Sequence, residues 1–134
     1  MPFNGEPADE AARQDESCNR NMCSLATNFI DFGFTVFMDA VVADRAELDR
    51  LLDLLAPRPV RLDVLAPGID TCRHRSATGE PVTERWEFAG YELLEAQMWR
   101  DLAEFGWWFD TAALTPRDTA ARLVTDVGRC PVLA

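Results

Sequence analysis

Three short apolar segments, separated by stretches with helical spacing, constrain the fold of this chain more than any other feature of its sequence. They cover residues 34–38, 60–66 and 106–110 and are rich in residues that favour β-strands. Strands that are apolar along their whole length are typical of parallel sheets covered by helices on both faces. The alternation of such strands with helices therefore predicts an α/β fold with a mainly parallel sheet of about three strands and flanking helices.

Apolar residues at helical spacing occupy the stretches between these segments. We predict helices from about Asp9 to just before Gly33, from a capping-box-like start at Asp44 to just before Pro57, from Ile69 to Ala77, over residues 86–105, and from Pro116 to Gly128. The first helix has an apolar stripe of Cys18, Met22, Leu25 and Phe29, with Ala26 and Ile30 beside it, and the second has Leu48, Leu51, Leu52 and Leu55 at helical spacing. The expected inner face of the fourth helix is Leu93, Leu94, Met98 and Leu102, and the last helix carries Leu123, Val124 and Val127.

Two polar residues carry local predictions. Thr115 precedes Pro116 and stands three residues before Asp118, which is the pattern of a helix N-cap followed by proline at the first helical position. Asp63 lies in the middle of the second apolar segment, where a carboxylate needs a polar partner, a sheet edge or water.

Length and composition suit one domain. The chain has 134 residues, and we expect a disordered arm over residues 1–8, which hold two prolines and a glycine, and a single α/β domain over residues 9–134. No run of 18 apolar residues occurs, and the first 16 residues are polar and acidic. We therefore expect a cytoplasmic protein whose four cysteines are reduced.

Charge excludes several classes of function. The chain has 23 acidic and 13 basic residues, a net charge of -10, which argues against nucleic acid and against an anionic membrane surface as partners. All basic residues are arginine, so catalysis through a lysine Schiff base and the phosphate-loop motif G-x-x-x-x-G-K-[ST] are both excluded within these residues.

Two features could handle phosphate. Asp39 directly follows an apolar segment, where a carboxylate held at a strand end can bind Mg²⁺ through water or accept a proton. The alternative is an aspartate that only favours a turn. Arg73 and Arg75 could contact an anion, although they would project in different directions from a helix. The alternative is a pair of solvated arginines close to acidic residues.

Two other groups favour structural roles. His74, the only histidine, does not form a common zinc-binding spacing with Cys72 or the other cysteines, and we expect it at the surface. Trp107 and Phe109 should share one face of their strand, with Trp108 on the other, and we interpret these aromatic residues and Trp99 as core packing.

Several segments together resemble a known family. They are residues 33–42, 59–67, 72–75, 90–92 and 106–116. From about residue 14 to residue 127, the chain is similar to the carboxyl-terminal two-thirds of small bacterial P-loop kinases of the "AAA family ATPase" or phosphotransferase-like type. Chloramphenicol phosphotransferase, adenylylsulfate kinase and the zeta-toxin kinases are of this kind.

The resemblance implies a P-loop kinase-like three-layer fold and an ATP-dependent small-molecule kinase. Its ligands would be ATP, Mg²⁺ and a small-molecule acceptor that the resemblance does not fix. Asp39 would be the catalytic carboxylate near Mg²⁺, and Arg73 and Arg75 would belong to a lid over the nucleotide. Asp110, Thr111 and Ala112 would lie beside the adenine.

The chain departs from that family in its phosphate-binding parts. It contains no glycine-rich loop ending in lysine, and residues 75–79 read Arg-Ser-Ala-Thr-Gly where related lids usually have Arg-Asn-x-x-Arg. The family's first strand would lie between segments 34–39 and 60–66, with 106–109 outside the latter. We therefore expect no kinase turnover from this chain alone, and self-association through an unfilled slot in the sheet. The alternatives are a non-catalytic nucleotide- or protein-binding α/β module and an unrelated α/β domain.

Overall fold

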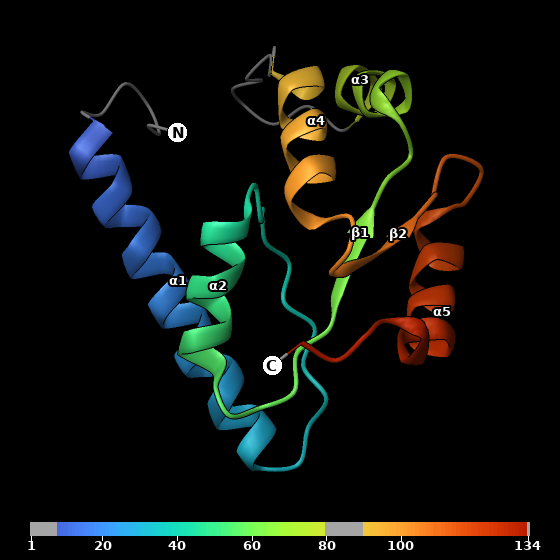
Figure 1. The fold of residues 1–134 in the computed structure, drawn as a ribbon. Coiled ribbons are helices and arrows are strands. Elements are labelled where there is room, and N and C mark those ends of the chain that lie inside the picture. Colours follow the sequence, from blue (N-terminus) through green and yellow to red (C-terminus); the bar gives the residue numbers. More distant parts are fainter. Residues whose placement is uncertain (1–7, 80–89, 134) are drawn as a thin grey trace. The chain divides into compact units, whose positions relative to one another are not determined.

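A computed structural model describes residues 8–79 and 90–133 of the protein (Figure 1). It confirms the predicted α/β class, with five α-helices and two parallel strands among these residues. The elements in chain order are α1 (Ala8–Asp31), α2 (Arg45–Leu55), β1 (Leu62–Leu65), α3 (Ile69–Thr78), α4 (Tyr91–Leu102), β2 (Gly106–Phe109), α5 (Pro116–Asp126) and the 3-10 helix η1 (Val127–Arg129). None of the helices in the described ranges has the length and apolar character that crossing a membrane requires.

The described residues divide into two compact units. The first holds the described part of residues 1–42 together with 46–60, and the second holds 43–45 and the described part of 61–133. A single domain over residues 9–134 stays a prediction. The predicted arm over residues 1–8 lies outside the described residues except for Ala8, which begins α1.

In the first unit, the face that α1 buries overlaps the predicted stripe only in part. Its buried residues are Ala11, Cys23 and Ala26, whereas Leu25 and Phe29 are exposed. The buried positions 23 and 26 each follow a predicted position, 22 and 25, by one residue, which corresponds to a rotation of about 100° around the helix. The predicted stripe is therefore displaced: Ala26, expected beside it, is buried, whereas Leu25 and Phe29 are exposed, because apolar spacing identifies a stripe but not the surface that covers it.

Helix α2 follows its predicted pattern. Leu48, Leu51 and Leu55 recur at helical spacing and are all buried. Arg58, just beyond the helix, donates two hydrogen bonds to the Asp31 carboxylate at the end of α1, at 2.9 and 2.6 Å. This bidentate ion pair joins the ends of the two helices of the first unit. The hydrogen bonds from Arg58 hold the pKa of the Asp31 carboxyl below its ordinary value.

The predicted strand at residues 34–38 is wrong, and the described sheet has two strands rather than about three. Residues 34–40 follow α1 as an extended segment without a strand partner. Phe34 and Phe37 are 61% and 55% exposed. An apolar segment becomes a buried strand only where a neighbouring strand pairs with its backbone, and no described residue provides that ladder.

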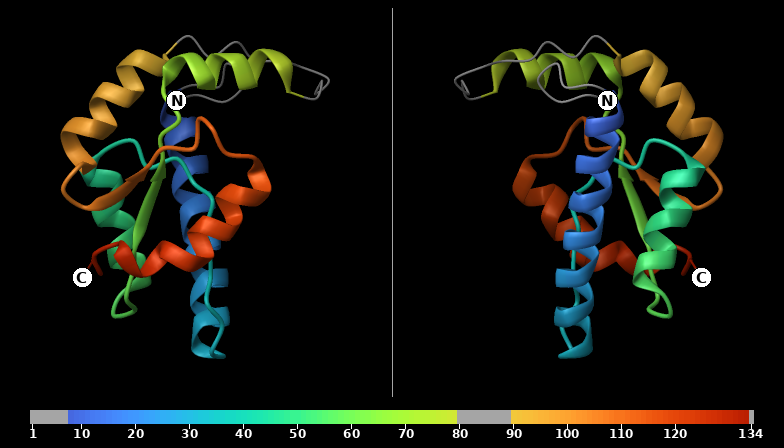
Figure 2. Two further views of the ribbon diagram at one scale, coloured as in Figure 1. Left: turned by 90° about the vertical axis from the view of Figure 1, so that its right-hand side faces the viewer. Right: turned by 90° about the vertical axis from the view of Figure 1, so that its left-hand side faces the viewer.

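In the second unit, β1 and β2 form a parallel pair whose register runs from Leu62 opposite Gly106 to Leu65 opposite Phe109. Figure 2 shows the pair from two sides. The chain leaves β1 through Gly68, whose φ of 93° favours glycine, and then forms α3. Trp107 and Phe109 share one face of β2 as predicted, with stacked rings 4.7 Å apart. The strand predicted at 60–66 is confirmed over residues 62–65. The strand at 106–109 lies next to it, as predicted.

Asp63 has the polar partner that its place in β1 requires. The Cys130 thiol, in the segment after η1, donates a hydrogen bond to the Asp63 carboxylate. Arg61 donates to the Cys130 carbonyl oxygen at 3.3 Å. Burial, followed by the hydrogen bond and the charge of Asp63, raises the pKa of Cys130 to about 12. Cys130 is therefore a protonated structural thiol that fastens the C-terminal segment to β1.

Helices α4 and α5 follow the sequence predictions in part. The predicted start of the fourth helix, residues 86–89, lies outside the described residues. Leu102 is fully buried, but Leu93 is 77% exposed, contrary to the prediction, because it lies off the line that Leu94 and Leu102 share along the helix. Val124 on α5 is 70% exposed. The N-cap of α5 is confirmed, since Asp118 donates its backbone N–H to Thr115 Oγ1 at 3.1 Å.

Candidate functional site

The carboxyl ends of β1 and β2 lie at the same edge of the parallel pair, where open α/β sheets commonly bind ligands. Ala66 follows β1 and extends the pairing by donating its N–H to the Phe109 carbonyl oxygen at 2.8 Å. Asp110 and Thr111 follow β2, and α3 begins shortly after β1. This edge therefore gathers four of the five residues that the resemblance places at or beside the nucleotide, namely Arg75, Asp110, Thr111 and Ala112. The fifth, Arg73, lies on α3 two residues before Arg75.

Arg75 and Thr111 are in direct contact. The Arg75 guanidinium donates from Nη1 to Thr111 Oγ1 at 3.3 Å and from Nη2 to the Thr111 carbonyl oxygen at 2.7 Å. Thr111 is 2% exposed and is the one polar residue classed as buried in the described part of the chain. The arginine satisfies both of its oxygens, so the contact fixes the end of α3 beside the turn that follows β2.

Arg73 points to different partners, as its spacing from Arg75 predicts. It forms ion pairs with Glu92 in the first turn of α4 and with Asp70, the latter at 3.8 Å. Its side chain is half exposed. The guanidinium charge is therefore already balanced by carboxylates, and Arg73 could bind a phosphate only by leaving them.

The turn after β2 is held by local hydrogen bonds. Asp110 Oδ1 accepts from the Ala112 backbone N–H at 2.8 Å, and the Thr111 carbonyl oxygen accepts from Leu114 N–H at 3.1 Å. This is a side-chain turn of the kind that aspartate favours. Asp110 and Ala112 are exposed, so the turn offers polar backbone and a carboxylate to solvent.

Asp39 belongs to the other compact unit. It lies in the extended segment after α1, and it is exposed. The predicted residues Arg75, Asp110, Thr111 and Ala112 lie together in the second unit, which also holds Arg73. Asp39 lies in the first unit and is not grouped with them. Within the described ranges, no three His, Cys, Asp or Glu side chains cluster closely enough to hold a metal ion.

Sequence reasoning missed a hollow of about 470 Å³ in the second unit. Helix α4 and the strand ends line it, through Ala66, Glu92, Glu95, Ala96, Trp99, Trp108 and Asp110. The rings of Trp99 and Trp108 meet edge to face with centroids 4.8 Å apart. Trp99 is 58% exposed, which corrects its interpretation as core packing. The helical spacing of residues 92, 95, 96 and 99 was the signal that could have revealed this face.

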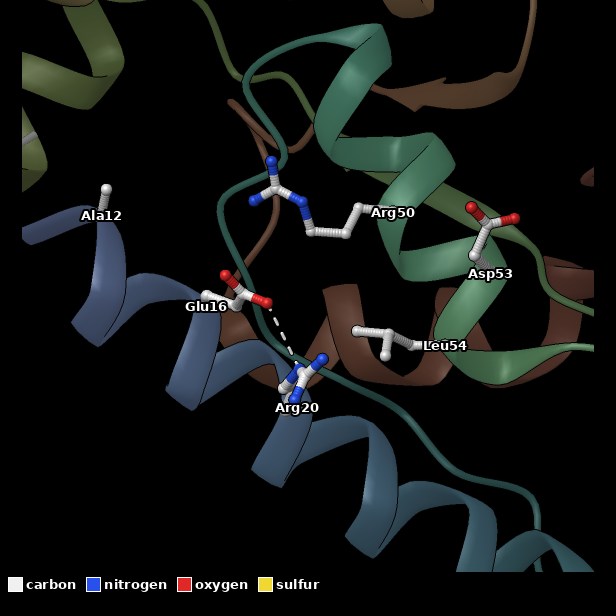
Figure 3. Close-up of a pocket in the computed structure, with 6 residues that line it drawn as sticks. All are labelled: Ala12, Glu16, Arg20, Arg50, Asp53 and Leu54. Atoms are coloured by element: carbon white, nitrogen blue, oxygen red, sulfur yellow. Dashed lines mark ion pairs between the residues drawn. The ribbon is translucent and has the colours of Figure 1, made fainter. Parts of the chain in front are cut away.

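A second hollow, of about 320 Å³, lies in the first unit between α1 and α2. Figure 3 shows its lining, which comprises Ala12, Glu16, Arg20, Arg50, Asp53 and Leu54. Glu16 and Arg20 form an ion pair along α1 at 3.3 Å. Two acidic and two basic side chains balance one another here, so this hollow has no net charge with which to select a ligand.

No protein-family model, curated protein or solved structure matches the chain.

Proposed function

We propose that this chain provides the lid and strand-end part of an ATP-dependent small-molecule kinase with a P-loop kinase-like, three-layer fold. The observation that carries the proposal is the contact between Arg75 and Thr111. The resemblance assigns both residues to nucleotide binding, although they stand 36 positions apart. Their meeting at the carboxyl edge of a parallel strand pair supports a ligand site there.

Arg75 has the chemistry that a phosphate group requires. A guanidinium has five N–H donors, and the two used on Thr111 fix its plane while others remain for phosphate oxygens. The exposed turn over residues 110–112 would lie beside the base. Arg73 would join the phosphates after leaving Glu92.

Asp39 is the residue that would hold Mg²⁺, through a water molecule. Its carboxylate is exposed and makes no contact with another described residue that would compete with this role. The ion, when bound, would neutralise charge on the phosphate oxygens during transfer. Asp39 itself would orient the metal's water shell.

These 134 residues contain no lysine, so the phosphate-loop lysine would have to come from another polypeptide or segment. We therefore expect nucleotide binding without turnover from this chain by itself. A full kinase reaction would require a partner that supplies the backbone N–H groups and the lysine of a phosphate loop.

Isothermal calorimetry with Mg-ATP tests the proposal. Arg75→Ala should weaken binding about tenfold, and Glu92→Gln should strengthen it because Arg73 loses a competing carboxylate. Asp39→Asn should remove the dependence on Mg²⁺ and leave metal-free binding unchanged. Arg117→Ala, which removes an equal charge from an exposed position on α5, is the matched control. Absence of heat at millimolar Mg-ATP, or equal affinity in the Arg75 and Arg117 variants, would refute the site.

The second candidate is a non-catalytic interaction module, and the exposed apolar side chains of the first unit favour it. Phe32, Phe34, Phe37 and Val41 are all exposed along the segment after α1 that has no strand partner. Exposed apolar clusters mark interaction surfaces. Under this candidate, light scattering should show concentration-dependent self-association that Phe37→Ser reduces, together with no binding of ATP. A monomer at all concentrations would exclude self-association through this segment.

A further inference from the structure

The segment after α1 has the extended backbone of a strand but not the hydrogen bonds of one (Figure 1). Within the described part of the chain, no hydrogen bond joins residues 35–42 to another residue. Burial alternates as in a strand, since Thr35 and Phe37 are exposed whereas Val36 and Met38 are half-buried. Extended backbone that is unpaired and carries apolar side chains is a template for pairing with another chain.

The hydrogen bond that Phe34 makes identifies the free edge of this segment. The Phe34 backbone N–H donates to the Phe29 carbonyl oxygen at 3.1 Å. Successive N–H groups of an extended chain point to opposite sides, so those of Thr35 and Phe37 point away from that contact. A partner strand would therefore bond to residues 35 and 37.

The sequence of the segment favours a second copy of this chain as the partner strand. Residues 32–38 read Phe-Gly-Phe-Thr-Val-Phe-Met, and short uncharged segments of this kind, rich in β-favouring residues and free of proline, pair with themselves. Asp39 determines the direction. Parallel copies in register would place two Asp39 carboxylates side by side, which is destabilising. Antiparallel copies centred on Val36 place Asp39 opposite Gly33 instead.

The exposed apolar surface is large enough for a dimer. Four phenylalanines of α1 and the segment after it are between 48% and 85% exposed, namely Phe29, Phe32, Phe34 and Phe37. With about 200 Å² for a whole phenylalanine side chain, a dimer could bury about 1,000 Å², which reaches the lower bound for a specific interface. Arg58 balances the Asp31 charge beside this surface, so that carboxylate does not oppose the approach of a second copy.

We propose that two copies of this chain form a symmetric dimer in which residues 34–38 pair as antiparallel strands centred on Val36. Thr35 of each copy would exchange backbone hydrogen bonds with Phe37 of the other, and the two Val36 residues would meet as a non-hydrogen-bonded pair. The dimer would be the form in which the second candidate function operates, so the proposal rests on that function and requires neither ATP nor Mg²⁺.

Analytical ultracentrifugation of the full chain tests the strand pairing. The wild-type protein should show a monomer–dimer equilibrium. Thr35→Pro should raise the dissociation constant of the dimer at least about tenfold, because proline lacks the N–H that faces the other copy, and each dimer loses two such bonds. Ala40→Pro, at an exposed position of the same segment outside the paired residues, is the matched control and should leave the constant unchanged. Circular dichroism verifies that both variants keep their helices.

Disulfide trapping tests the register independently of proline. Each variant also has exposed Cys18 replaced by serine and is oxidised with diamide. Val36→Cys should cross-link two copies, because the Cα atoms of a non-hydrogen-bonded pair are about 4.5 Å apart, within the reach of a disulfide. Met38→Cys, also half-buried, should not, because its two copies would lie about 14 Å apart.

The outcomes separate this dimer from the function on which it rests. A monomer at all concentrations would overturn both. A dimer that Phe37→Ser weakens and Thr35→Pro does not would retain self-association through the segment and overturn the strand pairing. Equal cross-linking at positions 36 and 38 would overturn the register in favour of parallel copies, and no cross-link at position 36 would overturn it as well.

Discussion

Replacing Asp63 by asparagine should speed the alkylation of Cys130. In the wild-type protein the pKa of this thiol is raised to about 12 from an ordinary 9.0, first by burial and then by the hydrogen bond and charge of Asp63. At pH 8 the thiolate fraction is therefore about one in ten thousand rather than about one in ten, and alkylation should be slower by a factor of about a thousand. Asparagine at position 63 removes the negative charge beside Cys130 but leaves the thiol buried. The rate of Cys130 alkylation should therefore rise about tenfold.

Iodoacetamide labelling followed by tryptic peptide mapping measures this change. The arginines at positions 20, 61, 73 and 129 separate the four cysteines onto four peptides, so each thiol has its own rate. Exposed Cys18 is the internal control and should react at the same speed in both proteins.

The pH dependence separates a changed pKa from partial unfolding. A lower pKa moves the inflection of the rate profile to lower pH, whereas unfolding raises the rate by one factor at every pH. A wild-type Cys130 that is labelled as fast as Cys18 would refute the reasoning, because the thiol would then be neither buried nor bonded to Asp63.

The same thiol gives stability a pH dependence. A group whose pKa is higher in the folded than in the unfolded protein stabilises the fold fully below the unfolded value. For Cys130 this contribution should be intact below pH 9 and lost as the pH rises toward 12. The urea midpoint of the second unit, followed by circular dichroism, should therefore fall between pH 8 and pH 10.5, and should fall less in Cys130→Ser. An equal fall in both proteins would assign the effect to other groups.

Three further changes test packing, capping and charge. Leu102→Ala should lower the free energy of unfolding by about 2–5 kcal/mol, whereas Leu93→Ala on the same helix should change it by less than about 0.5 kcal/mol, as measured by urea denaturation. Thr115→Ala should lower the free energy of unfolding by about 1 kcal/mol in the same assay, because α5 loses its N-cap. An unchanged free energy of unfolding would contradict the cap. Arg58→Gln should raise the pKa of Asp31 toward its ordinary value in a carboxyl NMR titration, and an unchanged pKa would show that the pair is not formed in solution.

Local sequence signals predicted most of the helices, because their causes are local. Thr115, Pro116 and Asp118 form a cap within four residues, and the structure places the helix start there. The leucines of α2 are buried in the predicted pattern. By contrast, residues 34–38 have the composition of a strand, but a strand also needs a partner backbone, and no pattern within five residues reports whether one is present.

The candidate site was predictable to a similar extent. The contact of Arg75 with Thr111 follows from parallel strands, since their carboxyl ends share an edge and the helix after β1 begins at that edge. The hollow was missed because Trp99 was interpreted as core packing together with the aromatic residues of β2. Its exposure depends on which elements cover that face of α4, which is a property of the packed chain and not of the helix sequence.

A parallel sheet of two four-residue strands has a consequence for amide protection. In each strand, successive N–H groups point to opposite sides, so about half of them face away from the neighbouring strand. Hydrogen exchange along residues 62–65 and 106–109 should accordingly alternate between slow and fast positions, instead of showing the uniform protection of a central strand. With so few shared bonds between the strands, the hydrogen bond from Cys130 to Asp63 adds a contact outside the ladder that holds β1 against the C-terminal segment.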